Sequence, residues 1–276
     1  MTMSQKKISE IIIYIILFIG AMVVLFPFIW MVLTALKPPH EALAYPPIFF
    51  PKNPTLDNFI KVFTQVPFSR YLLNSIYVST VITVSTLFFC SLGGYVFAKH
   101  KFPLRDFIFL GVIAKLMIPN QVQLIPMYFI TQRLHLIDNL WGIIVPGLMG
   151  AFGIFFMRQF FFGVPDSLLE AGKIDGLSEF GLYFKIALPL CKPALATLAI
   201  ITFIYAWDDF MWPLIIINSQ ENMTLPLGLA VFEGHYFAQY GLTMAAATVS
   251  ILPMLIVYLF MQKQIIESMA YTGIKE

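Results

Sequence analysis

The sequence carries very little charge. Of its 276 residues only 12 % are Asp, Glu, Lys or Arg, whereas 59 % are hydrophobic and the mean hydropathy is +0.82. Soluble domains carry about 25 % charged residues. A chain this apolar cannot cover its surface with polar groups, so the composition excludes an ordinary soluble domain and indicates that the solvent is lipid.

The sequence also lacks the motifs of several chemical classes. It has two cysteines, Cys90 and Cys191, far apart in the chain, and its four histidines are scattered, so we expect neither a disulfide nor a metal site. No HExxH, GxSxG or GxxxxGK[ST] motif occurs, which argues against an intramembrane hydrolase and against a nucleotide site in this chain. Asp208 and Asp209 are adjacent, and neighbours on a helix point about 100° apart, so they form no catalytic dyad.

What the chain does have is long apolar runs. Six are long enough to cross a hydrocarbon core of about 30 Å as helices. They cover approximately residues 11–36, 73–98, 107–131, 140–161, 194–218 and 243–262. Their polarity does not alternate as it would in a β-barrel. We therefore predict an all-α, polytopic membrane protein with six transmembrane helices in one domain, residues 1–276, whose first run is an uncleaved span.

Lysine and arginine predict the orientation. With the N-terminus inside, cytoplasmic segments hold eleven of the 17 basic residues, external segments hold five, and Lys115 lies within the third span. The short loop at 99–105 carries the clearest signal, because short loops weigh most in the positive-inside rule. We predict that both termini are cytoplasmic. The external loop at 37–72 is rich in proline, and residues 56–63 predict one short amphipathic helix in it.

The segment between the fourth and fifth spans, residues 162–193, is unusually polar and long. Ser167 followed by Glu170 predicts a capping box at a helix start, and Asp175-Gly176 predicts its end, with glycine in the left-handed conformation. Ser178-Glu179 predicts a second helix, which Pro189 should stop. Spacing gives this second helix one apolar face, made of Phe180, Tyr183, Phe184 and Ala187. We expect two short helices outside the membrane that contact a soluble partner, although a bland interfacial helix would also explain the second half.

This segment resembles the EAA loop of ATP-binding cassette (ABC) importer permeases. The family pattern is EAA, three residues, Gly, nine residues and Ile-x-Leu-Pro, and the chain departs from it only at Gly172, where alanine is usual. Glycine in a helix costs about 1 kcal/mol relative to alanine, so we expect a slightly softer helix here. The phrases MIPNQVQLIPMY, FIYAWDDFMWPLI and TGIKE extend the resemblance to the carbohydrate-uptake branch, similar to the second permease of maltose importers.

The resemblance implies a type I importer permease in the cytoplasmic membrane of a prokaryote. It implies pairing with a second, homologous permease as a heterodimer, a dimer of ATPase subunits that binds ATP and Mg, and an external solute-binding protein. It implies no cofactor or metal in this chain and no nucleic-acid partner. The residues that it assigns to ATPase coupling are Glu170, Ala171, Gly172, Asp175, Gly176, Ile186, Leu188 and Pro189.

Polar and aromatic residues inside the spans predict a transport path. Charged groups at mid-bilayer cost about 2.5–3.5 kcal/mol each, so they should face protein or water, and irregular helix at membrane depth lines a cavity or is buried in protein. The candidates are Asn120, Gln121, Gln123, Tyr205, Trp207, Asp208, Asp209 and Trp212. Packing against a second permease, with the aspartates bonding backbone near Pro213, is the alternative interpretation, and both stay open. Lys115 could pair with an aspartate, extend to the interface or meet an anionic substrate.

Two functions of different classes remain after these exclusions. One is a subunit of an ATP-driven importer with no catalysis of its own. The other is a self-sufficient secondary transporter or channel for small polar solutes. Secondary transporters usually contain internal inverted repeats, and no repeat is visible in this sequence, so we favour the importer subunit.

Overall fold

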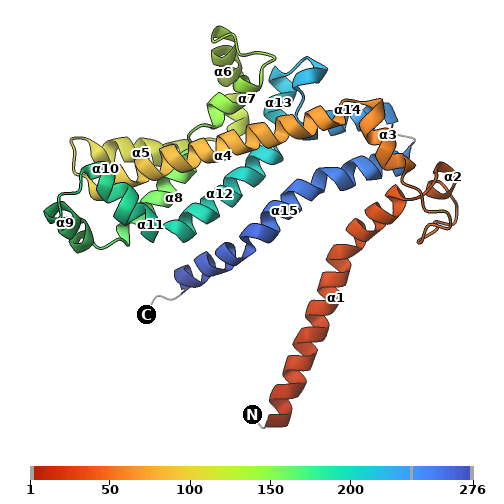
Figure 1. Ribbon diagram of the computed structural model, residues 1–276, viewed down its shortest axis with the longest axis horizontal. Helices are drawn as coiled ribbons and strands as arrows, with labels where there is room; N and C mark the ends of the chain where they lie inside the picture. The colour runs from red at the N-terminus through yellow and green to blue at the C-terminus, as the bar shows by residue number, and fades with distance from the viewer. Residues whose placement is uncertain (1–2, 237–238, 274–276) are drawn as a thin grey trace. The chain divides into compact units, whose positions relative to one another are not determined.

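The computed structural model describes residues 3–236 and 239–273, and these ranges are helical with no strand (Figure 1). The end of the C-terminal phrase TGIKE lies outside them. The prediction of an all-α protein is confirmed. The chain divides into two compact units, residues 1–68 with 229–252, and residues 69–228 with 253–276.

The first unit contains the N-terminal apolar helix and the proline-rich loop. Its helices are α1 (Met3–Ala35), α2 (Pro39–Ala42) and α3 (Asp57–Gln65). The α3 helix confirms the short helix predicted at 56–63. The buried Glu41 carboxylate accepts hydrogen bonds from the backbone N–H groups of Lys52 and Asn53, at 2.9 and 3.1 Å. The connection between α2 and α3 has no regular secondary structure, and these hydrogen bonds to Glu41 hold its backbone in place.

The second unit holds the remaining complete helices. These are α4 (Phe68–Lys99), α5 (Arg105–Leu116), α6 (Asn120–Arg133), α7 (Leu140–Gly147), α8 (Ala151–Phe162), α9 (Asp166–Ile174), α10 (Glu179–Leu182), the π-helix Tyr183–Ala187, α11 (Leu188–Leu190), α12 (Lys192–Trp207), α13 (Met211–Ile216) and the 3₁₀ turn Gln220–Asn222. Helices α14 (Leu225–Tyr236) and α15 (Tyr240–Gly273) continue from one unit into the other.

Helices α5 and α12 both pack on α8. Helices α9 to α11 gather at one end of this unit, and α6, α7 and α13 lie at the other (Figure 1).

The number of apolar helices agrees with the six predicted spans only if each pair of helices joined at a sharp bend is counted as one span. Four helical stretches in the described residues are long and apolar enough to cross a membrane, or up to six if each bent pair is one span. The third predicted span is two helices, α5 and α6, bent by 106° at a break that contains Pro119. The fifth predicted span is also interrupted, because α12 ends at Trp207 and α13 begins at Met211. Pro119 accounts for the break in the third span, where hydropathy alone predicted continuity.

Close contact between helices in the second unit depends on small residues. A Cβ atom on Gly94 of α4 would lie 2.8 Å from the backbone nitrogen of Arg158 on α8, and one on Gly153 would lie 2.7 Å from Cys90 Sγ. These positions let α4 and α8 approach with their backbones nearly touching, as glycines do in membrane helix pairs. The core around them includes Met157, Phe161 and Leu198, all buried.

One aspartate organises the opposite end of the second unit. The Asp138 carboxylate accepts hydrogen bonds from the N–H groups of Asn218 and Ser219, at 3.0 and 2.8 Å, and from the Ser219 hydroxyl at 2.9 Å. Partial burial pushes the pKa of Asp138 upward, but these hydrogen bonds outweigh it and hold the pKa below its usual range. The turn after α6 is thereby joined to the turn after α13.

Candidate functional site

The first helix of the 162–193 segment ends in a complete Schellman motif. The N–H of Leu177 donates to the carbonyl of Gly172, and the N–H of Gly176 donates to the carbonyl of Lys173, both at 3.0 Å. Gly176 has a φ of +82°, the left-handed conformation that the sequence predicted for it. The helix α9 therefore ends in a tight reversal that sets the direction of the chain into α10.

The start of α9 differs from the prediction. The helix begins at Asp166, directly after Pro165, and no side chain caps it. Ser167 lies inside the first turn, so the predicted capping box with Glu170 is wrong. Asp166 in the first turn complements the positive end of the helix dipole, and Glu170 stays on the exposed surface of α9.

Gly172 has a packing role that helix propensity could not reveal. It is buried, and a Cβ atom there would lie 2.5 Å from Ile186 Cδ1 and 2.7 Å from Leu182 Cδ2. The missing methyl group leaves space for these two side chains, which press onto α9 from the following helical segment. The glycine at the family's third position therefore brings the two halves of the segment together.

The second half of the segment is a continuous but irregular helix. Ser178 Oγ accepts from the N–H of Gly181 at 3.2 Å, which confirms the predicted helix start. Pro189 does not stop the helix as predicted. It lies within α11, and the chain turns after Leu190, where the axis bends by 80° before α12.

The predicted apolar face of this half is divided between two environments. Tyr183 and Ala187 are buried, but Phe180 and Phe184 are exposed, so a single apolar face is wrong. The residues that pack inward include Leu182, and the partly buried Ile186 and Leu188 join the same core. The π-helix at Tyr183–Ala187 shifts the spacing of the inward positions, which a period of 3.6 residues does not anticipate.

The segment is fastened to the end of α4. Lys99 Nζ donates to Asp166 Oδ1 and to the carbonyl of Val164, both at 2.6 Å, and its side chain is 8 % exposed. The Tyr183 hydroxyl lies 2.6 Å from Ser91 Oγ, also on α4. Two tethers from one helix therefore hold both halves of the segment.

Polar side chains around Glu179 add a third link. Its carboxylate lies 3.0 Å from Lys173 Nζ of α9 and 3.6 Å from His100 Nε2 at the end of α4. All three side chains are partly exposed, so each pair is weak alone. Together with Lys99 they orient α9, and the sequence held no local signal for these partners.

The outer surface of α9 carries one large apolar side chain among polar ones. Ile174 is 87 % exposed, and Glu170, Ala171 and Asp175 are exposed beside it. A large hydrophobic side chain held outward on an anchored helix is typical of a protein contact surface. Sequence reasoning missed Ile174. Its signal was an apolar residue directly before a predicted helix end, outside the apolar periodicity of the segment.

The predicted path residues of α6 lie at the bend of the third span. Asn120 and Gln121 are exposed at the start of α6. Gln123 donates to the carbonyl of Ile118 at 3.2 Å and accepts a hydrogen bond from Lys115 Nζ. Within the described residues Lys115 therefore pairs with an amide of the bend and not with Asp208 or Asp209.

The predicted path residues from the last turn of α12 to the start of α13 separate into packed and exposed groups. Trp207 is buried and stacks on Phe203, with ring centroids 5.8 Å apart. Trp212 is buried and donates through Nε1 to the Gly142 carbonyl at 3.0 Å. Tyr205 and Asp208 are exposed, while Asp209 accepts from the Trp212 N–H at 3.3 Å. The two tryptophans thus pack within this chain, and only Tyr205 and Asp208 of this set lie open.

Comparison with known proteins identifies the architecture. Residues 90–271 match the family described as binding-protein-dependent transport system inner membrane component. The chain is 35 % identical over 258 residues to the arabinooligosaccharides transport system permease protein AraQ of Halalkalibacterium halodurans, covering 92 % of each chain. It is 32 % identical to the sn-glycerol-3-phosphate transport system permease protein UgpE of Pectobacterium atrosepticum, covering 94 % of this chain and 95 % of that one.

A solved structure has the same fold. A chain of a bacterial ABC transporter involved in the import of the acidic polysaccharide alginate superposes with a TM-score of 0.83, covering 94 % of this chain and 97 % of that chain, at 24 % identity. The type I permease fold predicted from the sequence is confirmed. The short helices after α8 therefore sit in a known permease architecture.

Proposed function

Because this chain belongs to the binding-protein-dependent transport system inner membrane components, we propose that it forms half of the translocation path of an ABC importer for sugars or oligosaccharides. It is a transport subunit and not an enzyme, and ATP is hydrolysed by a separate subunit. Two relatives are named for the transport of arabinooligosaccharides and of sn-glycerol 3-phosphate. These names support a hydroxyl-rich substrate.

The coupling element in this proposal is α9. The observation that carries it is the exposed Ile174 beside Glu170 on a helix that is fastened from behind by Lys99 and Tyr183. An apolar anchor with a charged neighbour suits a groove on a soluble subunit. The helix α9 is tethered to α4 and packed on the segment that leads into α12. A movement of α9 is therefore transmitted to both of these spans.

The remaining partners follow from the same family. A second permease, homologous to this one, completes the path, and a solute-binding protein delivers the ligand from outside. The alginate importer solved with its pentasaccharide-bound periplasmic protein supports this arrangement. We place both termini in the cytoplasm and the 162–193 segment on the ATPase side, as the distribution of Lys and Arg favours.

The transport path in this proposal runs beside the bend of the third span and the break after α12. Asn120, Gln121, Tyr205 and Asp208 are exposed there, and hydroxyl-rich ligands need such polar and aromatic groups. Lys115 and Gln123 stiffen the bend. Trp207 and Trp212 are buried within the chain and pack beneath the residues that line the path.

The test uses the complete importer purified through a tag on this chain. Ile174→Asp and Glu170→Lys should lose the ATPase subunit during purification and lose ATP-dependent uptake of arabinooligosaccharides, while the level in the membrane stays normal. Ile60→Asp is the matched control, because Ile60 is an exposed isoleucine on α3, on the proposed external side. Full uptake and a retained ATPase in both α9 variants would refute the coupling role.

A further inference from the structure

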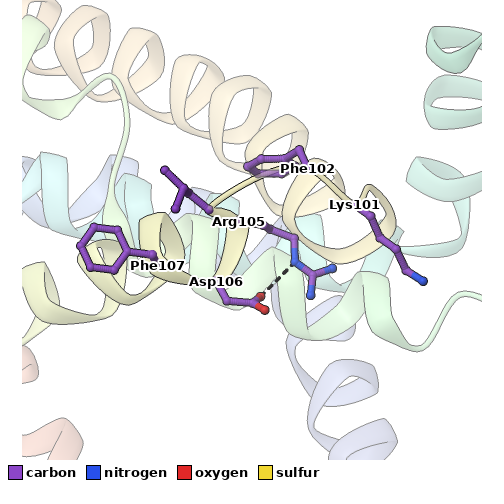
Figure 2. Close-up of a pocket in the computed structure, with 6 residues that line it drawn as sticks. Lys101, Phe102, Arg105, Asp106 and Phe107 are labelled. Atoms are coloured by element: carbon purple, nitrogen blue, oxygen red, sulfur yellow. Dashed lines mark hydrogen bonds and ion pairs between the residues drawn. The ribbon is translucent and has the colours of Figure 1, made fainter.

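The turn between α4 and α5 contains a hollow of about 300 Å³ (Figure 2). It is lined by Lys101, Phe102, Leu104, Arg105, Asp106 and Phe107. The turn joins the end of one predicted span to the start of the next, so it lies where lipid headgroups meet the protein. The proposed transport function does not use it.

Positive charge dominates the hollow. Arg105 Nε donates to Asp106 Oδ1 at 2.9 Å, and Figure 2 shows the Lys101 and Arg105 side chains on the same side of the turn. Arg158, whose guanidinium stacks 3.8 Å from the centroid of the Phe109 ring, adds a third cation close enough to stabilise the same carboxylate. The lining itself holds two cations, Lys101 and Arg105, against one carboxylate, so the hollow is net positive.

Apolar side chains stand exposed beside these charges. Leu104 is 71 % exposed and Phe107 is 72 % exposed. Leu104 also has a φ of +61°, a left-handed conformation that leucine rarely adopts. This strained backbone holds Leu104 outward, and such strain concentrates at ligand sites.

We propose that this hollow binds the headgroup of an anionic phospholipid, with Lys101 and Arg105 on the phosphate and Leu104 and Phe107 against the acyl chains. Charge complementarity selects an anion, since basic pockets beside membrane helices bind acidic lipid headgroups. The exposed leucine and phenylalanine select a lipid over free phosphate or an acidic peptide, because only a lipid brings hydrocarbon next to its phosphate. Arg105 is held in position by Asp106 and keeps its remaining N–H groups for the ligand.

The test is native mass spectrometry of the complete detergent-solubilised importer, titrated with phosphatidylglycerol or with phosphatidylcholine of the same acyl chains. The wild-type complex should retain one phosphatidylglycerol per copy of this chain in preference to phosphatidylcholine, and excess inorganic phosphate should not displace it. Equal retention of both lipids, or displacement by inorganic phosphate, would overturn the proposal. This comparison needs no variant, so it does not depend on how a mutant folds.

Variants then locate the site. Each cation near an anionic surface contributes about a fivefold factor, so Lys101→Gln with Arg105→Gln should weaken phosphatidylglycerol binding about 25-fold. The matched control, Lys52→Gln with Lys61→Gln, removes two exposed lysines of the 37–72 loop and should leave binding unchanged. Equal binding in the test and control variants, whether both retained or both lost, would overturn the assignment.

A third variant separates the apolar part from the charged part. Leu104→Gly suits the left-handed backbone and so relieves strain, and it should weaken lipid binding without lowering the thermal stability of the complex. Unchanged lipid binding in Leu104→Gly would overturn the apolar contact. Uptake measured in the same preparations distinguishes this proposal from the transport proposal, because loss of the bound lipid does not require loss of the ATPase subunit.

Discussion

Replacing Lys99 with methionine tests how firmly α9 is fastened. Methionine keeps the apolar stem but removes the ammonium that bonds Asp166 and the Val164 carbonyl, each at 2.6 Å. Asp166 is 76 % exposed, so water replaces its partner and that pair contributes about 1 kcal/mol or less. Val164 is buried, and a buried acceptor without its donor costs about 1–3 kcal/mol. We expect the contact between α9 and α4 to weaken by about 2 kcal/mol.

Hydrogen exchange measures this loss directly. If α9 opens locally, about 2 kcal/mol raises the exchange rate of its protected amides about 30-fold, while amides in the middle of α8 should not change. Asp166→Asn should raise the rate less than fivefold, because it leaves the bond to Val164 intact. Lys185→Met is the matched control, since Lys185 is an exposed lysine of the same segment. Unchanged exchange in Lys99→Met, or a larger effect in Asp166→Asn, would refute this reasoning.

Three further predictions concern other contacts. Gly176→Val should destabilise the importer by about 1–2 kcal/mol more than Gly176→Asn in thermal unfolding, because the φ of +82° excludes a branched side chain and tolerates asparagine; equal effects would contradict it. Ser91→Ala should cost about 1–3 kcal/mol by leaving the buried Tyr183 hydroxyl without this partner, and adding Tyr183→Phe should restore most of that loss in a double-mutant cycle. The Asp138 carboxylate has a lowered pKa when folded, so its contribution is complete above the unfolded value of about 3.9 and is lost as the pH falls through the folded value. Below about pH 4 the melting temperature of the wild type should therefore fall more steeply with pH than that of Asp138→Asn, because the variant has no carboxylate to protonate at this position.

Local patterns were sufficient for much of the fold. Apolar runs longer than a bilayer predict helices whatever their partners, and α1 and α4 cover the first two predicted spans. Gly176 was predictable because the turn requires a left-handed residue at that position. The short helix α3 was predictable from its own amphipathic pattern.

Features that depend on distant residues were not predictable. Hydropathy cannot distinguish a straight span from a pair bent by 106°, since both halves are equally apolar. Helix propensity marks Gly172 only as a weak helix residue, whereas its role is to leave space for Ile186, which lies where a side chain would be. The bond from Lys99 to Asp166 joins residues that are 67 positions apart, and no local spacing indicates it.

The same limit applies to the predicted transport path. Trp207 and Trp212 suit both sugar stacking and core packing by residue type. Both are buried, Trp207 stacks on Phe203 and Trp212 bonds the Gly142 carbonyl, so they pack within this chain. Tyr205 and Asp208 could not be separated from them by sequence, because all four lie within one short stretch. Uptake by Asp208→Asn and Tyr205→Phe variants remains the way to assign their roles.

The central claim is that a separate ATPase, acting through α9, drives transport through this chain. The most direct measurement is uptake, tested with a panel of oligosaccharides, by proteoliposomes that contain this permease and its paired permease. It is made with and without the ATPase subunit, in the presence of ATP and the loaded solute-binding protein. We predict uptake only when the ATPase is present, and its loss when α9 carries Ile174→Asp. Uptake at the same rate without the ATPase would contradict the account.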